Sequence, residues 1–272
     1  MRTHADQLTT ALRERYLDLL IGALTHTLYA DVDAIEPPAE LFDAGGMFTL
    51  EEYRQRADFA LERAEGRDWP RHGQTMIGLK RMRNIRDCVQ AIVTDDVPGD
   101  LIEAGVWRGG ASILMRGALE AFGDDQRHVW LADSFQGLPE PDLERYPADA
   151  DQAWAQSLDV LAVSVEQVRD NFRRYGLLDD RVHFVEGWFS DTLPGLRDRT
   201  WGMIRLDGDM YESTMDGLVN LYDGLAPGGF LLVDDYALPS CREAVDDFRR
   251  EHGIDDPIER IDWTGVFWRK RG

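Results

Sequence analysis

The sequence predicts an α/β fold of the doubly wound kind, in which helices cover both faces of a mostly parallel sheet. Apolar segments of strand length alternate with segments of helical periodicity from about residue 100 onward. A glycine-containing turn over 105–110 joins the first of these strands to a helix. Several of the strands end in an acidic residue, and the carboxyl ends of the strands are where open α/β sheets bind their ligands.

The segment before the sheet is expected to be mainly helical. Apolar positions at helical spacing predict a first helix, and Thr49 with Glu52 three residues later forms the capping pattern of a second. The expected elements are helices over 12–30 and 49–66, a loop over 31–48, and a third helix that follows 75–82 and ends near Val93. We therefore expect residues 1–98 to form a helical segment packed on a core of residues 99–272.

The core is expected to alternate strands with helices. The expected strands cover 100–104, 129–133, 182–186, 203–207, 230–235 and 265–268, and the expected helices cover 111–122, 164–175, 213–224 and 239–252. One connection, over 136–160, is long, acidic and contains three prolines. Because structureless connections of this length are uncommon in compact domains, we expect an acidic lid insertion at about 138–165.

Composition excludes several classes of partner. The chain carries 30 basic and 51 acidic residues, a formal charge of −21, which disfavours nucleic acids and anionic membranes. No apolar run approaches the roughly 20 residues that span a bilayer, and the first residues are polar. Two distant cysteines indicate a reducing compartment, so we expect a cytoplasmic protein. The apolar face of the first helix leaves a homo-oligomer open.

The turn after the first sheet strand indicates a nucleotide-type ligand. Glu103, Gly105, Gly109 and Gly110 form a Glu-x-Gly-x-x-x-Gly-Gly pattern, which is neither the dinucleotide fingerprint nor a P-loop. Taken alone, such a turn is equally consistent with a purely structural role. Asp133, at the end of the next strand, is positioned to hold two ribose hydroxyls. The two elements together favour an adenosine-type ligand.

Acidic residues at the ends of the later strands predict a cation site. Asp207, Asp234 and Asp235 follow adjacent core strands, and Asp209 lies two residues after Asp207. Parallel strands bring their carboxyl ends to one rim, where crowded carboxylates repel one another unless a positive charge lies among them. Hard oxygen ligands favour Mg²⁺, whereas the histidines lack the spacing of a zinc site. Neither a nucleophile elbow nor a reactive cysteine context is present.

These segments resemble the macrocin O-methyltransferase (TylF-like) family over roughly residues 12–270. The motifs that carry the resemblance are Thr75-Met76-Ile77-Gly78, Glu103 to Gly110, Ala132 to Gly137, Arg174 to Asp180, Leu206 to Tyr211, Val233 to Tyr236 and Ser240 to Ala244. The resemblance implies a Rossmann-like, class I methyltransferase that uses S-adenosylmethionine and Mg²⁺. Similar members, of the novobiocin and mycinamicin type, methylate a sugar hydroxyl of a glycosylated antibiotic or related metabolite.

Carried over residue by residue, the resemblance also implies a set of site residues. Cofactor binding falls to Thr75 and Met76 at the methionine part, Glu103, Gly105 and Ser112 at its carboxylate and amine, Asp133 and Ser134 at the ribose, and Ser190 and Asp191 at the adenine. Asp207, Asp234 and Asp235 are the implied metal ligands, and the proton acceptor is Asp207 or Asp209. The acceptor is implied to be a small-molecule glycoside whose identity is set by the variable N-terminal part and residues 138–165.

Two other functions remain open at this stage. A metal-dependent catechol or phenolic O-methyltransferase would use the same cation, because vicinal phenol oxygens chelate it as a sugar diol can. A non-catalytic adenosine-binding module that regulates a partner is the alternative of another class. It has no need of the clustered aspartates, so a requirement for a divalent cation would separate it from the enzymes.

Overall fold

The computed structural model describes residues 4–29, 34–35, 59–152 and 159–272. In this part of the chain the main sheet has seven strands in the order β5-β4-β3-β6-β7-β9-β8. The strands are β3 (Asp100–Ala104), β4 (Val129–Asp133), β5 (Val182–Glu186), β6 (Trp201–Leu206), β7 (Leu225–Val233), β8 (Glu259–Arg260) and β9 (Val266–Arg269). The first five are parallel, whereas β9 runs antiparallel to β7 and β8.

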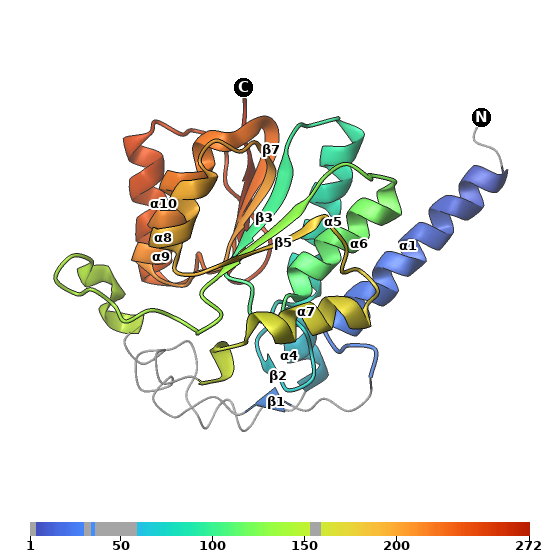
Figure 1. The fold of residues 1–272 in the computed structure, drawn as a ribbon, viewed down its shortest axis with the longest axis horizontal. Coiled ribbons are helices and arrows are strands. Elements are labelled where there is room, and N and C mark those ends of the chain that lie inside the picture. The colour runs from blue at the N-terminus through green and yellow to red at the C-terminus, as the bar shows by residue number, and fades with distance from the viewer. Residues whose placement is uncertain (1–3, 30–33, 36–58, 153–158) are drawn as a thin grey trace.

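Helices cover both faces of this sheet (Figure 1). One face carries α1 (His4–Leu24), α5 (Leu79–Thr94), α6 (Gly110–Phe122) and α7 (Val165–Arg174), and the other carries α8 (Phe189–Thr192), α9 (Tyr211–Leu221) and α10 (Pro239–Glu251). The sheet is therefore doubly wound and mostly parallel, as its alternating pattern predicts.

The smaller elements connect these layers. A second sheet pairs β1 (Ala34–Ile35) with β2 (Trp69–Pro70), next to α4 (Phe59–Glu65). The 3₁₀ helices are η1 (Pro147–Gln152), η3 (Asp159–Leu161), η4 (Leu193–Leu196) and η5 (Tyr222–Gly224). No helix in the described ranges is long and apolar enough to cross a membrane.

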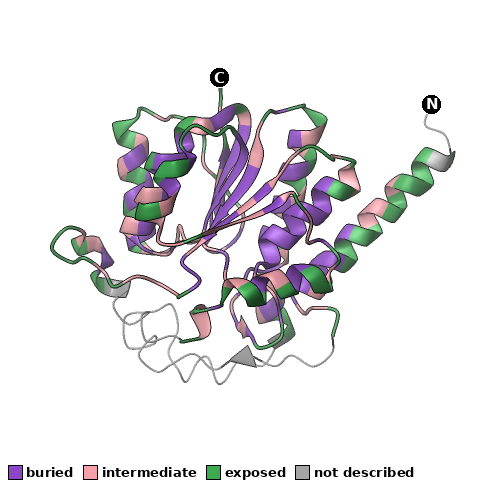
Figure 2. Ribbon diagram, viewed as in Figure 1, coloured by how far each residue is buried: buried purple, intermediate pink, exposed green. Residues whose placement is uncertain are grey.

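Two apolar clusters, one on each face of the sheet, form the core (Figure 2). Leu101 of β3 faces α5 and α6, whereas its neighbour Ile102 belongs to the cluster that includes Trp201 and Trp268. Alternate residues of a central strand point to opposite faces, so a strand covered on both sides must be apolar throughout. Glu103 and Arg205 are the fully buried exceptions in β3 and β6.

The element boundaries correct several expectations. Helix α1 covers 4–24 rather than 12–30, and α9 begins at Tyr211 rather than at residue 213. Strand β7 begins at Leu225, five residues earlier than expected. The short strands β1, β2 and β8 were not expected, because two-residue strands have no periodicity to detect. The Thr49 cap and most of the predicted 31–48 loop lie outside the described residues.

The topology fixes where a ligand site can form. From β3 the chain proceeds to β4 and β5 on one side of the sheet, and the later strands β6 and β7 lie on the other side. The strand order therefore reverses between β3 and β6. In open α/β sheets the crevice beyond the carboxyl ends of the strands at such a reversal is the ligand site.

Candidate active site

The turn between β3 and α6 requires glycine at position 105. Gly105 has a φ of +90°, and a Cβ on it would lie 1.7 Å from the carbonyl oxygen of Asp207. The turn therefore lies against the end of β6 in a way that no other residue permits. Further along, Gly110 donates its N–H to the carbonyl of Gln74 at 2.9 Å, which brings the Thr75–Met76 segment beside the turn.

Asp133, at the end of β4, is tied to the same turn. Its Oδ2 accepts the N–H groups of Val106 at 2.6 Å and Trp107 at 3.4 Å, and its Oδ1 accepts that of Phe135 at 2.7 Å. Burial raises the pKa of the Asp133 carboxyl, and these backbone donors oppose the rise. The carboxylate is thus held in one orientation at the mouth of the crevice.

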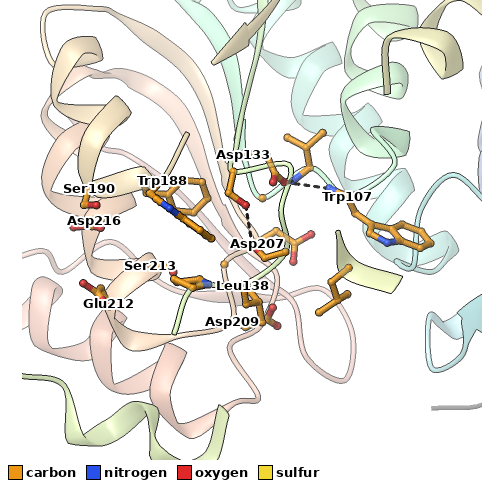
Figure 3. A pocket seen from close by; sticks show the side chains of 18 of the residues that line it. Trp107, Asp133, Leu138, Trp188, Ser190, Asp207, Asp209, Glu212, Ser213 and Asp216 are labelled. Atoms are coloured by element: carbon orange, nitrogen blue, oxygen red, sulfur yellow. Dashed lines mark hydrogen bonds between the residues drawn. The ribbon is translucent and has the colours of Figure 1, made fainter. Parts of the chain in front are cut away.

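A cavity of about 430 Å³ opens at this crevice (Figure 3). Asp207 and Asp209 lie at its centre beside Asp133, with Trp107 on one side and Ser190 on the other. Its other lining residues are Met76, Gly105, Val106, Ser134, Gly137, Leu138, Pro139, Glu140, Asp142, Leu161, Trp188, Phe189, Gly208, Glu212, Ser213 and Asp216. No lysine or arginine lines the cavity in the described part of the chain.

Behind the cavity, the buried guanidinium of Arg205 joins three carboxylates. It donates to Glu103 Oε1 at 2.7 Å, to Asp207 Oδ2 at 2.7 Å, and to Asp234 Oδ1. The pairing follows from register, since Glu103 and Arg205 lie opposite each other on the parallel strands β3 and β6. The carboxylates raise the pKa of Arg205 despite its burial, so the group is a fixed cation.

A second buried guanidinium, that of Arg81 from α5, reaches the same cluster. It donates to Asp234 Oδ2, to Asp262 Oδ2 at 2.9 Å, and to the carbonyl of Gly66 at 3.2 Å. Both oxygens of Asp234 are therefore bonded to arginine. The positive charge that the crowded acids require is supplied in part by these two side chains.

The remaining carboxylates keep an excess of negative charge. Carboxylate oxygens of Asp207, Asp234 and Asp235 all lie within 4.8 Å of one another. Burial and repulsion from Asp207 and Asp234 raise the pKa of Asp209 to about 7, and burial with repulsion from Asp209 raises that of Asp235 well above its usual value. The cluster can therefore bind a proton or a hard cation.

The implied cofactor residues fall into two groups. Met76, Gly105, Asp133, Ser134 and Ser190 line the cavity. Thr75, Glu103, Ser112 and Asp191 do not line it.

Glu103 corrects the expectation that four strands end in acids on one rim. It lies inside β3, 1% exposed, where Ser112 donates its hydroxyl proton to Oε2. Burial raises the pKa of the Glu103 carboxyl to about 7. Asp191, the other implied adenine residue beside Ser190, is exposed on α8. Ser134 lines the cavity, and its hydroxyl donates to the Gly137 carbonyl at 2.8 Å.

Sequence reasoning missed the two arginines of this site. Arg205 had a detectable signal, because it is the one charged residue in the otherwise apolar segment Trp201–Leu206. A buried charge is rarely tolerated without a partner. Arg81 had no such signal, since it lies on a helix with several other basic residues. Its contact with Asp234 joins positions 153 residues apart.

The family model of the macrocin O-methyltransferases (TylF) matches residues 13–270. The 8-demethyl-8-(2,3-dimethoxy-alpha-L-rhamnosyl)-tetracenomycin-C 4'-O-methyltransferase of Streptomyces olivaceus is 50% identical, over 96% of this chain and 95% of its own. The demethyldecarbamoylnovobiocin O-methyltransferase of Streptomyces niveus is 48% identical, over 94% of this chain and 93% of its own. The solved O-methyltransferase NovP superposes with a TM-score of 0.83 at 45% identity, covering 96% of this chain and 100% of that one.

Proposed function

The chain belongs to the macrocin O-methyltransferase (TylF) family, and from this membership we propose that it methylates a sugar hydroxyl of a glycosylated secondary metabolite, using S-adenosylmethionine and Mg²⁺. One observation carries the proposal: Asp133 of the proposed cofactor cradle and Asp207 of the carboxylate triad line the same cavity. A methyl donor and an acceptor oxygen must meet at one point, and this arrangement allows it.

The residues around the glycine turn fit the cofactor. Gly105 lines the cavity and brings the turn against the end of β6, and Asp133 presents a fixed carboxylate to the ribose hydroxyls. Met76 and Ser134 lie beside them, and Trp188 and Ser190 line the adenine end in this proposal. Thr75, Glu103, Ser112 and Asp191 act behind this surface or at its edge. Glu103 and Ser112 are hydrogen-bonded to each other and support the turn.

The triad fits a hard divalent cation. Asp207, Asp234 and Asp235 supply oxygen ligands within 4.8 Å of one another, and Arg81 and Arg205 neutralise only part of the cluster. When bound, the cation supplies positive charge at the acceptor oxygen, and S-adenosylmethionine supplies the methyl group. The roles of the protein are to orient the acceptor hydroxyl and to remove its proton.

We assign the proton acceptor to Asp209 rather than Asp207. Asp207 is bonded to Arg205 and belongs to the triad, whereas Asp209 lines the cavity outside the triad. A carboxylate oxygen of Asp209 takes the hydroxyl proton while the acceptor oxygen forms its bond to the methyl carbon and S-adenosylhomocysteine leaves.

The charge of the cavity supports an uncharged acceptor. Its described lining includes Glu140, Asp142, Glu212 and Asp216 but no basic side chain. A diphosphate, as carried by a nucleotide-linked sugar, would be repelled by these four carboxylates. We therefore propose that this chain acts on the sugar after it has been attached to an uncharged aglycone.

A panel of acceptors with three variants tests the proposal. The enzyme is incubated with S-adenosylmethionine and one acceptor at a time, in Mg²⁺ or in EDTA. The acceptors are desmethyl glycosides, a simple catechol and a nucleotide-linked sugar, and methylated products are identified by mass spectrometry. We expect methylation of a glycoside only, and only with the cation. Asp234→Ala and Asp207→Ala should abolish turnover, and Asp209→Asn should lower kcat by about 10²–10⁴-fold.

Titration calorimetry with S-adenosylhomocysteine separates cofactor binding from the metal role. Each variant should bind it within about threefold of the wild-type affinity, a difference of less than about 1 kcal/mol. Equal losses of cofactor affinity and rate would contradict a metal role for the triad. Methylation of the catechol alone would favour the phenolic alternative.

A further inference from the structure

Helix α9, which follows the loop that carries Asp207 and Asp209, has no capping side chain at its own N-cap position. Helix α9 begins at Tyr211, directly after the segment that carries Asp207 and Asp209. Its N-cap residue is Met210, whose side chain makes no capping hydrogen bond. The first N–H groups of any helix need acceptors from elsewhere, and they favour a carboxylate.

Asp149 of the acidic insertion supplies this cap. Its Oδ1 accepts the N–H of Tyr211 at 2.5 Å, and its Oδ2 accepts that of Glu212 at 3.2 Å. The carboxylate has no solvent exposure, although every residue from Asp142 to Arg145 is exposed. Burying a carboxylate costs free energy of desolvation unless its oxygens are well hydrogen-bonded, as the Asp149 oxygens are.

Further contacts fix the insertion at both described ends. Near Asp149, the ring of Tyr146 lies 5.7 Å from that of Tyr211, centroid to centroid. Beyond residues 153–158, the indole N–H of Trp107 donates to the carbonyl of Val160 at 2.8 Å. Trp107 belongs to the turn that holds Asp133. The insertion is thus attached to the cofactor turn at one end and to the start of α9 at the other.

The start of α9 in turn fixes Asp209. This residue has a φ of +57°, in the left-handed region where aspartate is one of the few non-glycine residues found. Its N–H donates to Asp235 Oδ2 at 3.3 Å, and its carbonyl accepts the hydroxyl of Ser240 at 3.3 Å. Both bonds are long, so the first turn of α9, two residues later, adds a further constraint on this loop.

We propose that Asp149 is a positioning residue, which aligns the acceptor-binding insertion with the proton acceptor Asp209 by capping α9. Leu138, Glu140 and Asp142 of the insertion line one wall of the cavity, while Glu212 and Ser213 of the capped turn line another. One buried carboxylate therefore sets the distance between the wall that holds the acceptor and the loop that takes its proton. This inference rests on the proposed function.

The test compares Asp149→Ala and Asp149→Asn with Asp124→Ala. Asp124 is the control because its carboxylate also accepts two backbone N–H groups, those of Gln126 and Arg127, before the amino end of β4; it pairs with the Arg127 side chain as well. The loss of a cap costs about 0.5–2 kcal/mol, or roughly 2- to 30-fold in an equilibrium. We expect Asp149→Ala to raise the acceptor KM and to lower kcat, each by about that factor. Asp149→Asn, which keeps an acceptor oxygen, should fall between it and the wild type.

Two readouts do not depend on turnover. Hydrogen exchange of the Tyr211 and Glu212 amides should accelerate by a similar factor in Asp149→Ala, and the affinity for S-adenosylhomocysteine should stay within about threefold. Unchanged exchange and kinetics in both Asp149 variants would overturn the proposal, as would equal kinetic losses in Asp124→Ala. If the wild type methylates no glycoside, the proposed function fails, and the exchange data still decide whether Asp149 anchors this loop. Should Asp149→Ala not fold, Asp149→Asn supplies the same comparison.

Discussion

Replacing Arg205 by methionine tests whether the buried guanidinium holds the centre of the site together. The substitution keeps an unbranched side chain of similar length but removes the donors to Glu103, Asp207 and Asp234. Removing one partner of a buried ion pair costs about 3–5 kcal/mol, because the remaining charge is left uncompensated. Arg81 still neutralises Asp234, and Ser112 still donates to Glu103. We therefore expect the free-energy cost of one broken ion pair, about 4 kcal/mol, and not the cost of three broken pairs.

The pH dependence of this loss has a definite sign. The pKa of Glu103 is raised to about 7 from 4.5 in the folded protein, so its ionisation costs stability as the pH rises between those values. Burial is the main cause, and Arg205 opposes it. Without Arg205 the folded-state pKa rises further, and the penalty keeps growing above pH 7. The free-energy difference between variant and wild type should therefore be larger at pH 8 than at pH 6.

Urea unfolding followed by circular dichroism, in EDTA at both pH values, measures the effect. At about 2–4 °C per kcal/mol for a chain of this size, the midpoint of thermal unfolding should fall by about 8–16 °C. Arg116→Met is the matched control, since Arg116 is equally buried but pairs with the partly exposed Asp179 at the opposite edge of the sheet. A loss no greater than that of the control, or one that shrinks at higher pH, would refute the reasoning.

Two smaller predictions follow from the same structure. Gly105→Ala should abolish calorimetrically detectable binding of S-adenosylhomocysteine, because its Cβ would overlap the Asp207 carbonyl. Gly123→Ala is the control, since Gly123 has a similar φ of +80° and a Cβ on it would have no atom within 4 Å. This control should lose only about 1–2 kcal/mol of stability. Asp179→Asn should lower the free energy of unfolding by about 1 kcal/mol at pH 7. The Arg116 guanidinium lowers the pKa of this carboxyl to about 2 from 3.8, and the partial exposure of Asp179 weakens the pair. That contribution is present above pH 3.8 and disappears as the pH falls through 2, so urea midpoints that differ equally at pH 7 and pH 2 would contradict it.

The sequence predicts the layers of this fold well because its signals are local. Strands β3, β4 and β5 and helix α6 appear within a residue of their expected bounds, since burial on one or both faces imposes a period of two or 3.6 on neighbouring residues. Helix α7 likewise lies within the expected range 164–175, and the hydroxyl of its N-cap residue Ser164 accepts the Gln167 N–H at 3.3 Å. The early start of α1 was not predicted, because Leu8 is exposed and gives no burial signal.

The candidate site was predictable only in part, because its decisive contacts are long-range. That Asp207, Asp234 and Asp235 converge follows from strand direction alone. That Arg205 lies between them and Glu103 follows from the register of β3 against β6, which no local pattern specifies. The cap supplied by Asp149 to α9 joins residues 62 positions apart, with α7, β5, α8 and β6 between them in the sequence. Such contacts are properties of the packed chain rather than of any segment.

The distribution of charge supports the proposal that a cation binds beside the two arginines. Arg205 and Arg81 pair with Glu103 and Asp234, which do not line the cavity, and Arg205 also pairs with Asp207, which does. Neither Asp209 nor Asp235 forms an ion pair with a basic side chain in the described part of the chain, and both have raised pKa values. The uncompensated charge therefore lies on Asp209, which lines the cavity, and on Asp235, which belongs to the triad, and these are the places where a proton from the acceptor and a cation are expected to arrive. Had the arginines been placed there instead, the carboxylates would be stable but unable to accept either.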